Sequence, residues 1–159
     1  MGLITIEQAR AHCRVDPDYP AEQLQPYMDG AESDASAYLN RDLFPTQEAF
    51  DAALDALPSK AAQASAAYAA AVEAASGIAD DDERRSTLEV ANLRRSQERE
   101  SAARVMAGMV SNASVVSAIL LTVGSRFANR EGTVVGAPAT ELPLGVKEIL
   151  RPFRRIMMP

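Results

Sequence analysis

The feature that most constrains the fold is an alanine-rich run in the middle of the chain. From Ser59 to Ser76, ten of 18 residues are alanine, and the only large apolar side chains are Tyr68 and Val72. Alanine has the highest helix propensity, and the run lacks the β-branched and aromatic residues that favour strands. Gly77 follows, at the position where a helix C-cap is expected. This part of the chain is therefore predicted to be a helix.

Two further helices are expected beside it. A short one, capped by Thr46, ends before Pro58, because proline disfavours a helical residue in front of it. A long one runs from about Asp81 to Val110, and the acids of "ADDDERR" suit its N-terminus. We expect residues 46–104 to form an inserted helical hairpin.

The flanking residues, 1–45 and 105–159, are expected to form one helical core with a C-terminal docking segment. Thr5 and Gln8 have the spacing of a capping box, which predicts a helix that ends near Arg14. The other core helices are expected at Pro20 to about Asn40, where Pro26 marks either a kink or the true start, and at Val115 to about Asn129. "GTVVGAPAT" is either a short extended arm or a flexible loop. The predicted fold class is all-α: a small helical bundle, an inserted alanine-rich hairpin and a short C-terminal helix.

The last helix lies in "ELPLGVKEILRPFRR". Pro143 suits a first helical turn and Pro152 ends the regular helix. Apolar residues recur on one face at Val146, Ile149, Leu150 and Phe153. A helix this short does not persist alone in water, so its apolar face must be covered. Two arrangements are open: the segment docks on a partner protein, or it folds back onto its own bundle.

The residues that carry most enzyme chemistry are scarce. Cys13 is the single cysteine, which excludes an intrachain disulfide and a zinc site built from cysteines. His12 is the only histidine, and neighbouring helical side chains point roughly 100° apart, so the two cannot form a nucleophile–base pair. The chain has no Walker loop, no G-x-G-x-x-G, no Glu-x-x-His and no calcium-binding loop. We expect no enzyme, no metal and no cofactor.

The charges are unevenly distributed. Residues 1–83 carry 16 acids and 4 bases, whereas residues 84–159 carry 6 acids and 12 bases, for a total of −6. A small helical DNA-binding regulator is the alternative function, but the sequence pI of about 4.8 argues against it. "MGLITIEQAR" is not a signal peptide and no apolar stretch is long enough to span a membrane, so we expect synthesis in the cytosol.

Both ends of the chain resemble the head–tail connector (adaptor) proteins of long-tailed bacteriophages. "LITIEQARAHCRVD" resembles their opening, "AESDASAYLNRDLF" their next helix, "SAILLTVGSRFANRE" a later helix, and "ELPLGVKEILRPFRR" their closing signature. The opening motif matches in order at Ile4, Thr5, Ile6, Glu7, Ala9, His12, Arg14, Val15 and Asp16. The chain departs from the family pattern at Pro26 and in the insertion of about sixty residues, where members usually have a short linker.

The resemblance implies a structural virion protein at the head–tail interface, made in the cytoplasm of the host bacterium. Such adaptors form a ring, usually of twelve copies, beneath the portal protein. They extend its channel, through which genomic DNA passes without specific binding, and they offer a platform for stopper or tail-completion proteins. The resemblance implies that the C-terminal segment docks on the portal. Its expected contact residues are Val146, Ile149, Leu150, Arg151, Phe153, Arg154 and Arg155.

Overall fold

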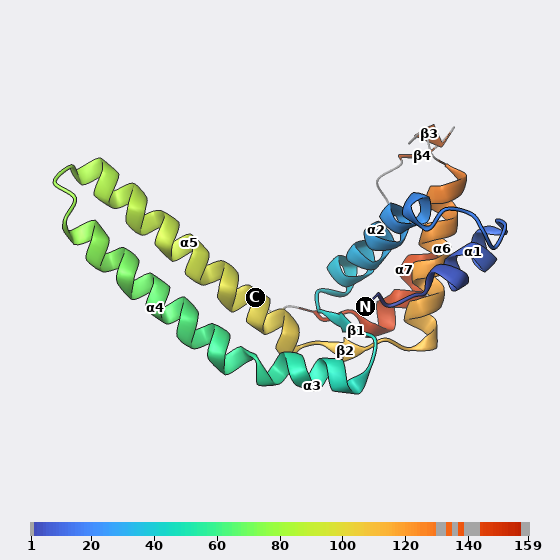
Figure 1. Cartoon of the computed structure of the whole chain (residues 1–159), viewed down its shortest axis with the longest axis horizontal. Coiled ribbons are helices and arrows are strands. Elements are labelled where there is room, and N and C mark those ends of the chain that lie inside the picture. The colour runs from blue at the N-terminus through green and yellow to red at the C-terminus, as the bar shows by residue number, and fades with distance from the viewer. Residues whose placement is uncertain (1, 130–132, 135–136, 139–143, 157–159) are drawn as a thin grey trace. The chain divides into compact units, whose positions relative to one another are not determined.

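The structure, a computed structural model, describes residues 2–129, 133–134, 137–138 and 144–156 (Figure 1). Its helices are α1 (Ile6–Cys13), α2 (Ala21–Leu39), α3 (Gln47–Asp55), α4 (Leu57–Ser76), α5 (Asp81–Met106), α6 (Ala113–Ala128), α7 (Leu144–Leu150) and the 3-10 turn η1 (Arg151–Phe153). Its strands have two residues each: β1 (Leu43–Phe44), β2 (Met109–Val110), β3 (Thr133–Val134) and β4 (Ala137–Pro138). The predicted all-α fold class is confirmed.

The chain divides into two compact units. Unit 1 comprises Met1–Gln47 and Gly108–Pro159, and unit 2 comprises Glu48–Ala107. The expected division at 46–104 differs from these bounds by a few residues at each end. The role of unit 2 as a separate inserted domain stays a prediction.

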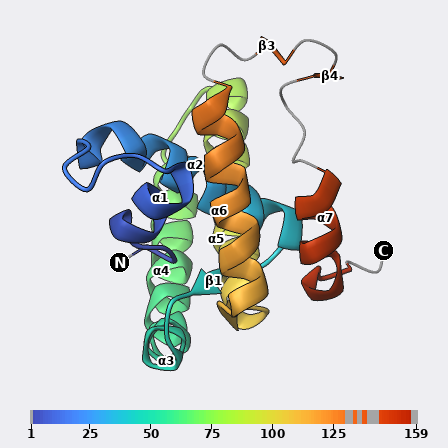
Figure 2. The same cartoon turned by 90° about the vertical axis from the view of Figure 1, so that its right-hand side faces the viewer.

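Unit 1 is built around α6, which packs against α1, α2 and α7. Figure 2 shows α6 between α1 and α7. Asn112 caps α6 by accepting the Val115 N–H at 3.0 Å, and the inner face of α6 buries Val115, Ala118, Ile119 and Val123. The buried Thr122 hydroxyl donates to the Ala118 carbonyl oxygen at 3.0 Å, so the one polar side chain on this face is satisfied.

The start of the chain is fixed to α2 by a carboxylate. Glu32 accepts hydrogen bonds from the Leu3 and Ile4 N–H groups at 2.7 and 3.1 Å. The predicted capping box then begins α1, since Thr5 accepts the Gln8 N–H and Gln8 accepts the Thr5 N–H. These contacts bring Ile4 into the core, where it is buried.

Two of the expected helix boundaries differ in the structure at prolines. Helix α2 begins at Ala21, directly after Pro20, and runs through Pro26 without a break. Pro58 does not precede the alanine-rich helix but lies in its first turn, where its missing N–H is tolerated. Pro143 lies outside the described residues, as do 130–132, 135–136 and 139–142 around the expected arm.

The prediction that a helix reaches Val110 is wrong. Helix α5 ends at Met106, and Met109–Val110 pairs in parallel with Leu43–Phe44. The Met109 N–H donates to the Asp42 carbonyl oxygen at 3.1 Å and the Ser111 N–H donates to the Phe44 carbonyl oxygen at 2.8 Å. The pairing satisfies backbone groups that a continued helix would have satisfied within itself. The pairing joins the two segments of unit 1 at the points where unit 2 begins and ends.

Unit 2 is dominated by the hairpin, defined here as α4 and α5, which pack side by side (Figure 1). All of residues 48–107 are described, and those buried among them are Ala75, Ala91 and Val105. The Arg95 guanidinium lies 4.6 Å from the centre of the Tyr68 ring and links the two helices. Small side chains and this cation–π contact therefore contribute to holding the hairpin together.

Candidate functional site: the terminal segment

The terminal segment, residues 144–156, consists of α7, η1 and the three residues after them. Regular α-helix gives way to the 3-10 turn at Arg151, directly before Pro152. Because Pro152 has no N–H, it cannot continue the helical hydrogen-bond pattern. The predicted end of the helix is therefore observed, and Arg154 follows in extended backbone.

The apolar face of the segment lies against the bundle of its own chain. Val146 and Leu150 are 1% and 0% exposed and belong to the core of unit 1, while Ile149 and Phe153 are half-buried against that core. The helices that they contact are α6 and α2. The sequence leaves open whether the segment docks on a partner or folds back onto its own bundle. In the structure it folds back onto its own bundle.

Backbone and ring contacts hold the segment at the end of α2. The Arg155 N–H donates to the Leu39 carbonyl oxygen at 2.9 Å. The Tyr38 hydroxyl donates to the Lys147 carbonyl oxygen at 3.5 Å, and the Arg154 guanidinium lies 5.1 Å from the centre of the Tyr38 ring. These contacts fix the direction in which the chain leaves the bundle.

Cations and one apolar side chain remain on the outer side of the segment. Arg151 and Arg154 are exposed and Arg155 is half-buried. Arg151 lies 3.9 Å from the Glu148 carboxylate, but both side chains are about three-quarters exposed, so the pair contributes little. Ile156 is 84% exposed, the most open of the large apolar side chains described. It lies beyond the helical repeat, which is why the periodicity of the sequence did not single it out.

His12 and Cys13 do not form a reactive pair. The imidazole of His12 is exposed and lies over Gly124 of α6, where an added Cβ would come within 3.0 Å of its Cδ2 and Nε2. Cys13 packs against the core, and burial raises the pKa of its thiol. A raised pKa lowers the thiolate fraction, which is the opposite of what a nucleophile needs.

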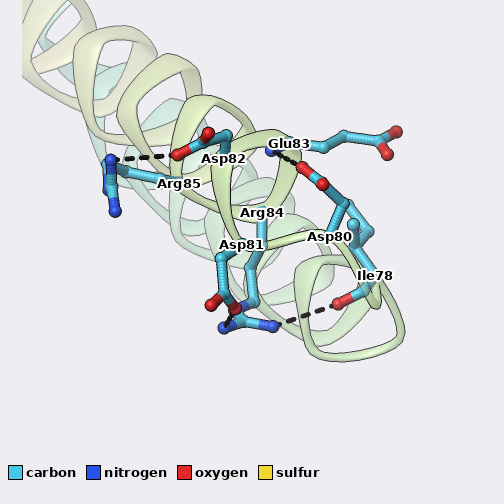
Figure 3. A network of polar contacts seen from close by, with 7 residues as sticks. All are labelled: Ile78, Asp80, Asp81, Asp82, Glu83, Arg84 and Arg85. Carbon is cyan, nitrogen blue, oxygen red and sulfur yellow. Dashed lines mark hydrogen bonds and ion pairs between the residues drawn. The ribbon is translucent and has the colours of Figure 1, made fainter.

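Both arginines at the tip of the hairpin pair with acids of the same helix (Figure 3). Asp80 caps α5 by accepting the Glu83 N–H at 2.8 Å, as the acidic start of this helix predicts. Arg84 pairs with Asp81 and donates to the Ile78 carbonyl oxygen at 3.1 Å. The tip is thus a capped helix start.

Arg85, the second arginine at the tip, also has an acidic partner. Arg85 lies 3.2 Å from Asp82, three residues before it on the same helix. The "RR" pair at 84–85 therefore forms no isolated cationic patch of the kind that phosphate recognition needs. Among the residues that the structure describes, no group of three His, Cys, Asp or Glu side chains is placed to hold a metal ion, and no helix is long and apolar enough to cross a membrane.

Comparison with known proteins identifies a family. The family model described as "Phage gp6-like head-tail connector protein" matches residues 3–154. No curated protein and no solved structure matches the chain. The matched range includes most of both segments of unit 1, the whole hairpin and residues 144–154 of the terminal segment. The chain therefore belongs to the phage gp6-like head-tail connector family, and its role is that of a structural connector in the phage particle.

Proposed function

We propose that the chain assembles beneath the portal as a ring, with twelve copies. The ring extends the channel for genomic DNA and carries the stopper or tail-completion protein on its far side. The observation that carries this proposal is the family match over residues 3–154. Its site of action is the head–tail interface of the virion.

The terminal segment is the proposed portal-binding element. Val146 and Leu150 hold it on the bundle, since both are buried within unit 1. The portal then contacts the outer side of the segment, where charged and partly exposed side chains lie. These contact residues are Ile149, Arg151, Phe153, Arg154 and Arg155, together with the exposed Ile156.

This arrangement suits recognition of a partner more than self-stabilisation. An exposed arginine contributes little to the stability of its own chain, but it recognises carboxylates on a partner with directional hydrogen bonds. Ile156 exposes an apolar side chain that a bound partner would cover. Because α7 is already folded against α6, little ordering entropy opposes binding.

The proposal is tested by measuring the affinity of the chain for the portal protein of the same phage. Arg151→Glu is expected to weaken binding by about tenfold or more, which corresponds to roughly 1.4 kcal/mol. Arg14→Glu is the matched control, because Arg14 is an exposed arginine elsewhere in unit 1 and the charge change is the same. If both variants bind the portal as tightly as the unchanged chain does, the terminal segment is not part of the portal contact.

The proposed DNA channel leads to an expectation about how strongly the chain binds duplex DNA. A channel wall that bound phosphate tightly would retain the DNA that has to move through it. Unit 1 and unit 2 both have more acids than bases, which agrees with a wall that repels the duplex. Duplex DNA is therefore expected to bind weakly at physiological salt. Sub-micromolar binding that falls steeply with salt would favour the DNA-binding regulator instead.

A further inference from the structure

The side chain of Tyr38 contacts the terminal segment at two points. Tyr38 lies near the C-terminal end of α2, where it is half-buried and packs against the core of unit 1. Its hydroxyl donates to the Lys147 carbonyl oxygen on α7 at 3.5 Å. Its ring centre lies 5.1 Å from the guanidinium of Arg154, which follows η1. One residue of α2 therefore contacts both the helix of the segment and the residues after it.

The ring of Tyr38 has the better geometry of the two contacts. Hydrogen bonds between a hydroxyl and an oxygen usually measure about 2.5–3.0 Å, so the contact at 3.5 Å is weak. A guanidinium within about 6 Å of a ring centre is attracted to the face of the ring. The contact with Arg154 lies inside this range. We therefore assign the effect of Tyr38 on the segment to its ring and not to its hydroxyl.

The backbone at Arg154 is fixed independently of Tyr38. The Arg154 N–H donates to the Arg151 carbonyl oxygen at 3.2 Å, and the Arg155 N–H donates to the Leu39 carbonyl oxygen at 2.9 Å. What the ring restricts is the side chain of Arg154. Arginine is among the residues whose side chains lose most conformational freedom when they are held in place. The ring thus reduces this freedom before any partner binds.

The Arg154 guanidinium keeps the capacity to bind a partner. Arg154 is exposed, and a guanidinium has five N–H donors, more than contact with one ring can occupy. Carboxylates are the groups that these donors recognise with directional hydrogen bonds. Ile156, two residues further on, is 84% exposed. The matching surface on a partner therefore has a carboxylate beside an apolar patch.

We propose that Tyr38 is a positioning residue for the portal contact: its ring holds the Arg154 guanidinium ready to bind a carboxylate of the portal. This inference rests on the proposed function, because the portal is the partner. Holding one flexible side chain in advance removes an ordering cost from binding. That cost corresponds to about two- to tenfold in affinity.

The first test removes the ring. Tyr38→Leu keeps an apolar side chain and is expected to weaken affinity for the portal about two- to tenfold. Tyr38→Phe keeps the ring and is expected to bind as the unchanged chain does. Tyr27→Leu is the matched control, because Tyr27 is another half-buried tyrosine of α2, roughly three turns earlier, whose ring packs edge-on against Phe127. Circular dichroism and thermal melting of each variant show whether it is folded.

The second test separates positioning from a general structural role. In a chain that carries Arg154→Ala, there is no guanidinium for the ring to hold. Tyr38→Leu is then expected to cause little further loss of portal affinity, so the two changes are not additive. A purely structural role predicts the same loss with and without Arg154. If Tyr38→Leu does not fold, Tyr38→Met repeats the cycle with a side chain that adapts to irregular gaps.

The outcomes separate this inference from the proposed function. If the unchanged chain does not bind the portal, the proposed function is wrong and this inference is wrong with it. If the unchanged chain binds and Tyr38→Leu binds equally well, the portal contact stands and Tyr38 does not position it. Equal losses from Tyr38→Leu in the two backgrounds, or no loss from Arg154→Ala alone, would likewise overturn the inference.

Discussion

Leu150 and Arg151 are adjacent residues with opposite environments. The Leu150 side chain is fully buried in the core of unit 1, whereas the Arg151 side chain is 75% exposed. Leu150→Ala is expected to lower the free energy of unfolding by about 2–5 kcal/mol, the usual cost of a cavity at a buried leucine. Arg151→Ala is expected to change it by about 0.5 kcal/mol or less. Urea denaturation of both variants measures this, and similar values for the two would show that α7 is not part of the core.

Gly124 allows the His12 ring to lie close to α6. An alanine there gains helix propensity, about 0.5–1 kcal/mol, but its Cβ would push on the imidazole at 3.0 Å. Gly124→Ala is therefore expected to stabilise the chain more in a His12→Ala background than in the unchanged one. A double-mutant cycle by thermal or urea denaturation measures the difference. An identical effect in both backgrounds would mean that the ring moves aside freely.

Among the elements, those with local signals were predicted from the sequence. The Thr5–Gln8 box, the Asp80 cap and the alanine run all act over a few residues, and each produced a helix where it was expected. The pairing of Leu43–Phe44 with Met109–Val110 joins residues far apart in the chain, so no local sequence pattern predicts it. The Met109–Val110 stretch continues the apolar pattern of α5, which is why the helix was predicted too long.

The hairpin is expected to be dispensable for the folding of unit 1. The residues of the main core cluster come from unit 1 alone. Replacing residues 48–107 with a flexible linker is therefore expected to leave a cooperative thermal transition and a helical circular dichroism spectrum. The linker needs several residues, because β1 and β2 are parallel and the chain has to cross back from the end of one to the start of the other. Loss of the cooperative transition would show that unit 2 belongs to the core.

For the molecule as a whole, the sequence predicted the terminal segment but not how its faces are used. The repeat of Val146, Ile149, Leu150 and Phe153 showed that one face is covered. Periodicity does not say whether this face packs against the same chain or against another protein, because the same apolar face is buried in either case. The structure assigns that face to unit 1 and leaves the arginines and Ile156 outside. What these side chains contact in the virion stays a proposal.

Electron microscopy of the purified chain mixed with the portal protein of the same phage is the most direct test of the proposed function. The expected result is a ring of this chain stacked on the portal, coaxial with its channel, with the terminal segment at the contact between the two. Arg151→Glu is expected to reduce the fraction of portals that carry a ring, and Arg14→Glu is not. Portals that stay bare at saturating concentrations of the folded chain would contradict the proposed function.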